Sequence, residues 1–143
     1  MNKLEDLSWD KDKKAQEEAI SFFSNDGSFN FNQLIKESPK KIMSNLVEVI
    51  TNKKIGEQYQ SIKGLLYLLK DLSWPGSENA MSLLKSYPKE ALLPDLENTL
   101  KEASQENDDN WLGNLKTLIK YHLLTKNDFK SLDLVQVLEK AAW

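Results

Sequence analysis

The chain of 143 residues repeats parts of itself, and this repetition restricts its possible folds more than any other feature. Asp71-Leu72-Ser73-Trp74 repeats Asp6-Leu7-Ser8-Trp9 at a spacing of 65 residues. The segment from Pro39 to Gly64 resembles the segment from Pro88 to Gly113 at a spacing of 49 residues. Recurring units of about this length are typical of stacked helical hairpins, which need their neighbours to bury an apolar face. Such scaffolds usually bind partners and seldom carry out chemistry.

Apolar residues recur at helical spacings along the chain, and no stretch alternates apolar and polar residues for long enough to predict a strand. We expect a helix capped by Asp12, a helix with Ser38 as its N-cap and Pro39 at its first position, and helices near 57–72 and 77–86. A further helix follows Pro88 and contains Pro94, which predicts either a kink or a helix that begins at Pro94. Lys126-Asn127-Asp128 predicts a turn before a last helix that ends at Trp143.

The repetition and the periodicity together predict a fold class. We expect an all-α, HEAT-like stack of antiparallel helical hairpins with about six to seven helices. No Gly- or Pro-rich linker interrupts the chain, so residues 1–143 are expected to form one domain. The two spacings differ by 16 residues, and we assign the difference to an insertion at 28–38 within the first repeat. We expect this insertion to be a loop that leads into a short helix whose aromatic residues join the core.

Composition restricts the compartment and the chemistry. The chain has no cysteine, no secretory signal at its start, and no apolar run near the roughly 20 residues of a membrane span. We therefore expect a soluble, cytoplasmic protein that does not bind membranes. His122 is the only histidine, so a zinc site and a His-based catalytic set are not predicted. Helix packing or a surface position is the expected role of His122.

Other sites of chemistry are not predicted either. The five glycines are dispersed, so no phosphate-binding loop is expected. The segment around Gly27 resembles a calcium loop, but it would place Phe22 and Gln33 where an EF-hand needs carboxylates. We predict no catalytic residue, no metal and no cofactor. Paired carboxylates such as Glu17-Glu18 leave a small carboxylate-based enzyme as a remote alternative.

The formal charge of −3 is unevenly distributed. Residues 95–110 carry six carboxylates and one lysine, a local charge of −5. Such a segment disfavours nucleic acid, which needs a basic surface, and suits a basic protein partner. A solvated helix face with an acidic capping loop is the simpler interpretation. The predicted partner-binding residues are Asp95, Glu97, Glu102, Glu106, Asp108 and Asp109.

The tryptophans stand at similar places in the repeated units. Trp9, Trp74 and Trp111 each follow Ser or Asn at a predicted helix entrance, which favours packing of one hairpin on the next. An exposed ring used for recognition is the alternative, because Trp is enriched at interface hot spots. We expect core packing for Trp74 and Trp111, and leave both roles open for Trp9 and Trp143.

Two sets of residues carry a resemblance to known families. Pro88 with Leu93, Leu96 and Leu100, followed by an acidic loop and Asn110-Trp111, resembles a HEAT-like repeat. Asp71-Leu72-Ser73-Trp74-Pro75-Gly76, with Tyr87-Pro88 and Asp108-Asp109-Asn110-Trp111, resembles a small bacterial family of unknown function. That resemblance covers roughly residues 65–124 and implies fold without catalytic residues. The first copy departs from it, since Asp10 stands where the second copy has Pro75.

We therefore expect a non-catalytic protein-binding domain. Its small size, all-helical character and acidic segment are similar to those of immunity proteins, which neutralise bacterial toxins. An immunity protein that binds a basic toxin domain is the specific hypothesis. The alternative is a structural or regulatory scaffold that recognises a peptide or another subunit along the groove between hairpins.

Overall fold

The computed structural model describes residues 4–130, and these residues form helices, turns and loops without a β-strand. The prediction of an all-α fold is confirmed for this part of the chain. Its eight α-helices are α1 (Lys13–Ser24), α2 (Phe31–Glu37), α3 (Lys40–Thr51), α4 (Ile55–Tyr59), α5 (Ile62–Tyr67), α6 (Ser77–Ser86), α7 (Lys89–Gln105) and α8 (Asp109–Tyr121). Three 3-10 helices accompany them: η1 (Leu4–Leu7), η2 (Leu68–Lys70) and η3 (Lys126–Asp128).

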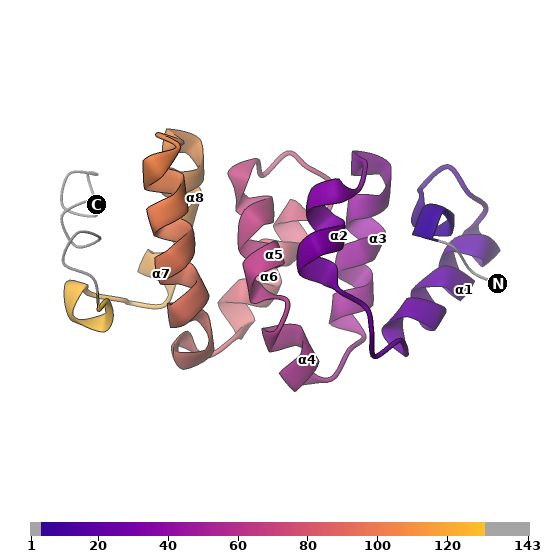
Figure 1. Cartoon of the computed structure of the whole chain (residues 1–143), viewed down its shortest axis with the longest axis horizontal. Helices are drawn as coiled ribbons and strands as arrows, with labels where there is room; N and C mark the ends of the chain where they lie inside the picture. Colours follow the sequence, from indigo (N-terminus) through magenta and orange to yellow (C-terminus); the bar gives the residue numbers. More distant parts are fainter. Residues whose placement is uncertain (1–3, 131–143) are drawn as a thin grey trace.

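The helices follow one another in a row from the N-terminal end to the C-terminal end (Figure 1). At the N-terminal end, α1 and η1 pack against α3. In the middle of the row, α2 packs against α5, and α5 also contacts α6 and α7. At the other end, α8 packs against α7 and η2. Each helix thus buries its apolar face mainly against elements nearby in the row.

The two repeated prolines begin the helices α3 and α7, although one position later than expected. Pro39 and Pro88 are the N-caps, with extended backbones (φ −69°, ψ 159° and φ −67°, ψ 147°). We predicted Ser38 as the cap; instead its backbone N–H bonds to the Leu34 carbonyl and ends α2. A proline suits the cap because its φ is already fixed and it has no N–H to leave unpaired.

Helix α7 begins at Lys89 and runs through Pro94 to Gln105. The alternative prediction of a helix that begins at Pro94 is therefore wrong. Pro94 cannot donate to the Glu90 carbonyl four residues earlier. Both residues are exposed, so water can bond to this carbonyl in place of the missing donor.

The helix predicted over 57–72 is broken in the structure. It is divided into α4, α5 and η2, with an interruption at Gln60-Ser61. Before the break, the Tyr59 ring packs edge-on against Tyr87 with centroids 5.2 Å apart. After it, Ile62 and the leucines of α5 are buried in the core. The change of direction lets both apolar groups pack, which one straight helix would not do.

Other local predictions are confirmed. Helix α6 covers the expected residues 77–86, and the Asp12 side chain caps α1 by accepting from the Ala15 N–H at 2.8 Å. The insertion at 28–38 contains α2, whose Phe31 and Ile35 are buried. Phe129 is also buried, but most of the predicted last helix, including Trp143, lies outside the described residues.

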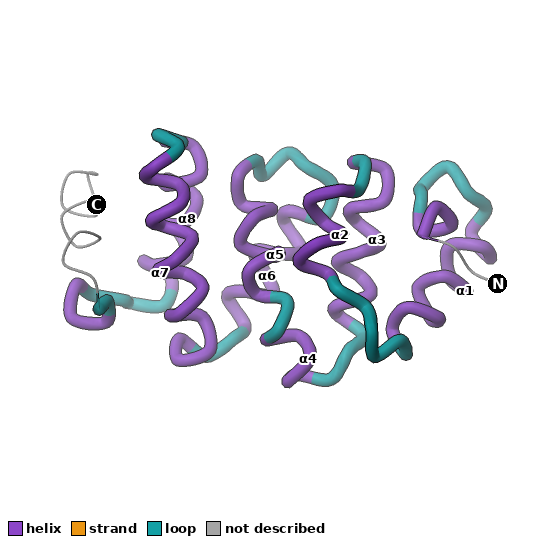
Figure 2. The backbone as a smooth tube through the Cα atoms, in the orientation of Figure 1, coloured by secondary structure: helices purple, strands orange, loops and turns teal. Residues whose placement is uncertain are grey.

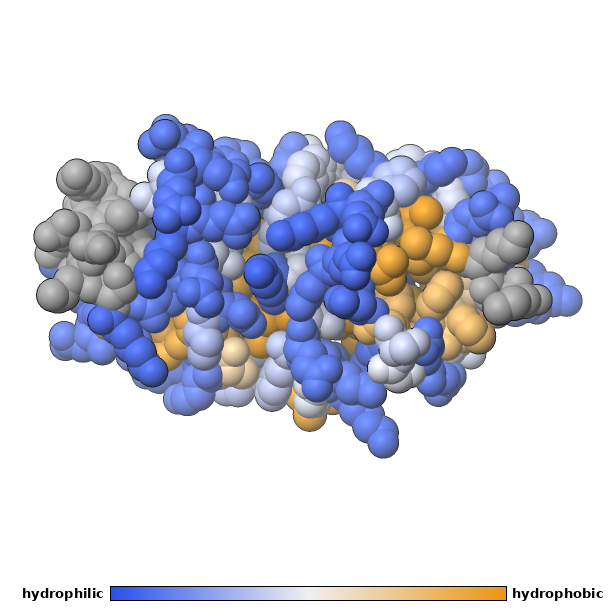
Figure 3. Space-filling view, in the orientation of Figure 1, coloured by the Kyte–Doolittle hydropathy of each residue, from blue (hydrophilic) through white to orange (hydrophobic). Residues whose placement is uncertain are grey.

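The view in Figure 3 shows a mostly hydrophilic face. Apolar residues gather on this face at the seam between α1 and the pair α2–α3. Within the described part, none of the helices combines the length and the apolarity that a bilayer span requires.

Candidate functional site

Four connections between helices lie at one edge of the fold, at the top of Figure 2. They join η1 to α1, α2 to α3, η2 to α6, and α7 to α8. We call this edge the loop edge and define it as residues 8–12, 38–39, 71–76 and 106–108. Both copies of the repeated tetrapeptide end there. Two of the six predicted partner-binding residues, Glu106 and Asp108, lie in the loop edge, and Asp109 follows directly.

The two copies of the tetrapeptide lie on opposite sides of α3. On one side, the Asn45 Nδ2 group donates to the Leu7 carbonyl at 2.7 Å, and the Trp9 N–H bonds to the Lys41 carbonyl at 3.0 Å. On the other side, a Cβ on Gly76 would lie 3.0 Å from the Cγ2 atom of Val47. Asn45 and Val47 are about 200° apart around a helix with 100° per residue. Helix α3 therefore holds both loops in place.

Ser77, at the start of α6, and the Asp108–Asn114 segment cap the C-terminal end of α5 and η2. The last carbonyls of a helix have no partner within that helix. Here four of them accept hydrogen bonds from side chains. The donors are Trp111 Nε1 to the Leu66 carbonyl (3.0 Å), Ser77 Oγ to Leu68 (2.8 Å), Asn114 Nδ2 to Leu69 (2.7 Å) and Asn110 Nδ2 to Lys70 (3.0 Å). Asn110 and Trp111 of the Asp108–Trp111 motif thus have a structural role.

A lysine and three aromatic rings meet beside this cap. The Lys70 Nζ atom lies 2.9 Å from Glu106 Oε1 and 4.8 Å from the centroid of the Trp111 ring. Tyr67 contacts both Trp74 and Trp111, at centroid distances of 5.7 and 6.4 Å. The hydrogen bond to Glu106 raises the pKa of Lys70, although partial burial opposes this. The cluster fixes the α7–α8 turn against η2.

The three tryptophans are not equivalent in the structure. Trp111 is 1% exposed and Trp74 is partly buried against the core, so core packing is confirmed for Trp111 and in part for Trp74. The Trp9 ring is 58% exposed. Ser73 Oγ donates back to Asp71, whereas Ser8 Oγ donates forward to Asp10, which replaces Pro75 of the second copy. The two turns differ because the proline has no side-chain acceptor.

The six predicted partner-binding residues do not form one ridge. Asp95, Glu102 and Glu106 share one face of α7, but Glu97 lies about 160° around the helix from Asp95. Glu97 accepts from the Lys130 N–H at 3.0 Å, and Asp108 accepts from the Trp111 N–H at 3.0 Å.

Burial raises the pKa of the Asp95 carboxyl, and the charge of Lys63 partly offsets this. Glu106 is bonded to Lys70, Asp108 acts as a cap and Glu97 accepts from Lys130, so Asp95, Glu102 and Asp109 are the three of the six that make no hydrogen bond or ion pair among the described residues. Asp109 is exposed, in the first turn of α8. It is the predicted residue best placed to meet a partner at the loop edge.

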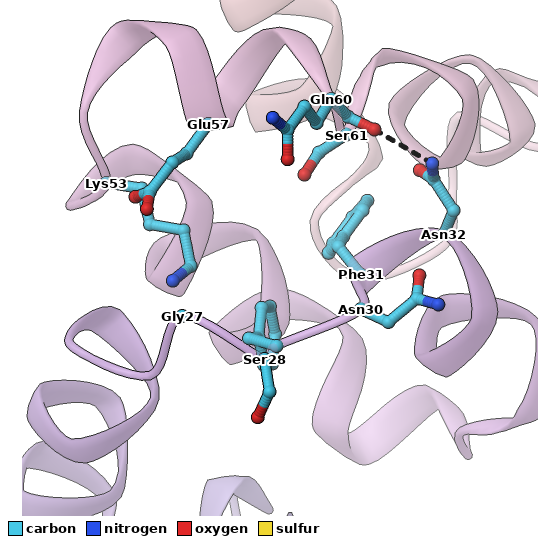
Figure 4. A pocket seen from close by; sticks show the side chains of 10 residues that line it. Gly27, Ser28, Asn30, Phe31, Asn32, Lys53, Glu57, Gln60 and Ser61 are labelled. Carbon is cyan, nitrogen blue, oxygen red and sulfur yellow. Dashed lines mark hydrogen bonds between the residues drawn. The ribbon is translucent and has the colours of Figure 1, made fainter.

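A small polar cavity of about 180 Å³ lies at the other edge, between the α1–α2 loop and α4 (Figure 4). Lys53 and Glu57 lie on the same side of it. The Lys53 ammonium donates to the carbonyls of Asp26 (3.0 Å) and Ser24 (3.4 Å), and Asn32 Nδ2 donates to the Gln60 carbonyl (2.9 Å). The volume is below the ~300 Å³ at which small-molecule sites usually begin. Its polar groups mainly hold the loop.

His122 ends α8, and its Nε2 atom lies 3.0 Å from the Leu84 carbonyl oxygen. This contact joins α8 to α6 and agrees with the predicted packing role. Across residues 4–130, no group of three or more Cys, His, Asp or Glu side chains could hold a metal ion.

The chain was compared with protein-family models, with curated proteins and with solved structures, and none of the three comparisons gives a match.

Proposed function

We propose that this chain is a non-catalytic protein-binding domain and that its partner contacts the loop edge. The observation that carries the proposal is the position of Trp9. Its ring is 58% exposed, while its backbone N–H is fixed to α3 through the Lys41 carbonyl. A solvent-exposed indole is costly to leave in water and is a frequent anchor of protein interfaces.

Neighbouring groups extend this surface. Leu72 of the second copy is 40% exposed on the other side of α3. Asp109 and the α7–α8 turn add negative charge farther along the same edge. An apolar anchor beside charged groups fits a partner with a basic rim around an apolar pocket.

We also propose that the helices form a HEAT-like stack of hairpins. Two facts support this: α3 and α7 begin 49 residues apart, each after a proline cap, and the aligned Gly64 and Gly113 lie within α5 and α8. Stacked hairpins form extended surfaces that such proteins use for binding. Fold alone does not assign the partner.

The specific form of the proposal is an immunity protein that binds and neutralises a basic toxin domain. The alternative is a scaffold domain that recognises a peptide or a subunit along the groove between hairpins. Binding of a toxin at the loop edge would depend on Trp9, whereas binding of a peptide in that groove would not.

The test is affinity capture from the native cell with three baits: the unchanged chain, Trp9→Ala and Tyr121→Ala. Tyr121 is 57% exposed at the far end of α8, so it is matched to Trp9 in exposure. The dissociation constant of the captured partner is then measured for each variant. We expect Trp9→Ala to weaken binding at least about tenfold and Tyr121→Ala to leave it unchanged.

The role of negative charge at the loop edge is tested with a second pair of variants. Asp109→Lys should slow association, and Glu90→Lys should not, because Glu90 lies in the first turn of α7 at the other edge. Rescue of growth when the chain is co-expressed with the toxin would support the immunity form. Equal binding by all four variants would overturn the assignment of the loop edge.

A further inference from the structure

We infer that residues 4–24, which we call the N-terminal cap, open from α3 as one unit while α3 to α8 stay folded. The cap consists of η1 and α1. This inference concerns conformational change and does not rest on the proposed function.

The cap buries little apolar surface. Leu7 and Ala19 are its two fully buried apolar residues, and Ala19 has a small side chain. Ile20 and Phe23 are partly buried, and Phe22 is 43% exposed. By contrast, α3 buries six large apolar residues, including two isoleucines and a leucine. Because the free energy of burial grows with apolar area, the cap gains less from burial than α3, the helix against which it packs.

The position of the N-terminal cap in the fold also indicates weak attachment. It lies at one end of the row of helices (Figure 1), and its main contacts beyond itself are with α3. Apolar residues remain visible along the seam between α1 and α2–α3 (Figure 3). The helices α5 and α8, by comparison, contact several elements each.

Polar bonds make up much of the attachment. Asn45 Nδ2 donates to the Leu7 carbonyl at 2.7 Å and to Gln16 Oε1 at 2.9 Å, and the Trp9 N–H bonds to the Lys41 carbonyl at 3.0 Å. Water can replace such bonds when the cap opens, so each contributes only modestly to holding it closed. Opening would uncover the face of α3 that carries Ile42, Asn45 and Val49 at helical spacing.

A lysine anchors the loop that follows the N-terminal cap. Lys53, which follows α3, donates to the Ser24 and Asp26 carbonyls and lies 5.3 Å from the centroid of the Phe29 ring. It holds the loop at residues 25–30 to the end of α3. This loop is therefore the hinge about which the cap moves.

Hydrogen exchange of the full chain, measured by mass spectrometry over a series of low denaturant concentrations, tests the inference. We expect amides in 4–24 to exchange at least about tenfold faster, relative to their unprotected rates, than amides in α5–α8. We also expect their exchange to depend on denaturant with a common, intermediate slope. Asn45→Ala should accelerate exchange in 4–24 by about five- to tenfold and leave α5–α8 unchanged.

Asn114→Ala is the matched control, because Asn114 makes the corresponding bond to the Leu69 carbonyl at 2.7 Å. It should accelerate exchange around α8 without a selective effect on 4–24. Two outcomes would overturn the inference. One is an equal opening free energy for 4–24 and α5–α8, and the other is a denaturant slope near zero across 4–24, which indicates fraying of single helix ends.

Discussion

The Trp111 indole Nε1 group donates a 3.0 Å hydrogen bond to the carbonyl oxygen of Leu66, 45 residues earlier in the chain. The ring is 1% exposed, so water cannot replace the bond. One residue of α8 thereby fills the core and caps the helix α5. The tryptophan of this motif therefore has a structural role, through contacts of this kind.

Trp111→Phe should therefore lower the free energy of unfolding by about 2 kcal/mol or more, because it removes a buried hydrogen bond and leaves a cavity beside the Leu66 carbonyl. Urea unfolding followed by circular dichroism measures this. Trp9→Phe is the control, and its effect should stay within about 0.5 kcal/mol because the ring is exposed. Similar losses in both variants would contradict the structural distinction between the two tryptophans.

Gly64 and Gly113 correspond in the repeat but should respond oppositely to alanine. A Cβ on Gly64 would lie 2.7 Å from the buried Phe31 ring and 2.8 Å from Asn32 Oδ1, so Gly64→Ala should destabilise by about 1–3 kcal/mol. A Cβ on Gly113 would meet nothing within 4 Å, so Gly113→Ala should stabilise α8 by about 0.5–1 kcal/mol. Thermal unfolding of both variants is the measurement, and shifts of the same sign would refute the prediction.

Asp71 should make stability depend on acid pH. Hydrogen bonds from Ser73 Oγ (2.6 Å) and the Ser73 N–H (2.8 Å) lower the pKa of Asp71 below its ordinary value of 3.8. The contribution is present at neutral pH and is lost as the pH falls through the pKa of the folded state. Asp71→Asn keeps an acceptor oxygen without the charge, so its stability should fall less between neutral pH and pH values below 3.8. Parallel curves for the two proteins would exclude this role.

Asp95 should make stability depend on pH in the opposite direction from Asp71. Burial raises its pKa, and Lys63 opposes this only in part, so the folded state favours the neutral carboxyl. Its contribution is present below the pKa of the unfolded state and is lost as the pH rises through the folded pKa. Asp95→Asn should therefore be at least as stable as the unchanged chain at neutral pH, whereas Asp109→Asn should change little. A clear loss of stability in Asp95→Asn would indicate instead that the carboxylate has a specific partner.

Local features of the fold were predictable from the sequence. The Asp12 cap, the bounds of α6 and the aromatic insertion at α2 depend on residues within one or two turns of each other. Helical spacing and cap residues act at that range, so their pattern is readable in the chain itself.

Features that depend on distant residues were not predictable. The interruption at Gln60-Ser61 follows from packing against Tyr87 and α2. The acidic residues of 95–110 are neighbours in sequence, but the turn of α7 and the positions of Lys70 and Lys130 separate them. The candidate site was predicted only in part. Core packing of Trp111 was expected, but the role of Trp9 stayed open, because its exposure depends on which distant residues pack around it.

The amino-acid sequence by itself determined that the described chain is helical and where most of its helices begin, because capping and periodicity are short-range effects. The tertiary structure alone decided which tryptophan is buried, which glycine is crowded and which carboxylates are neutralised. Those outcomes depend on the atoms that α3, α5 and α8 bring together, and the residues that supply these atoms lie tens of positions apart in the chain.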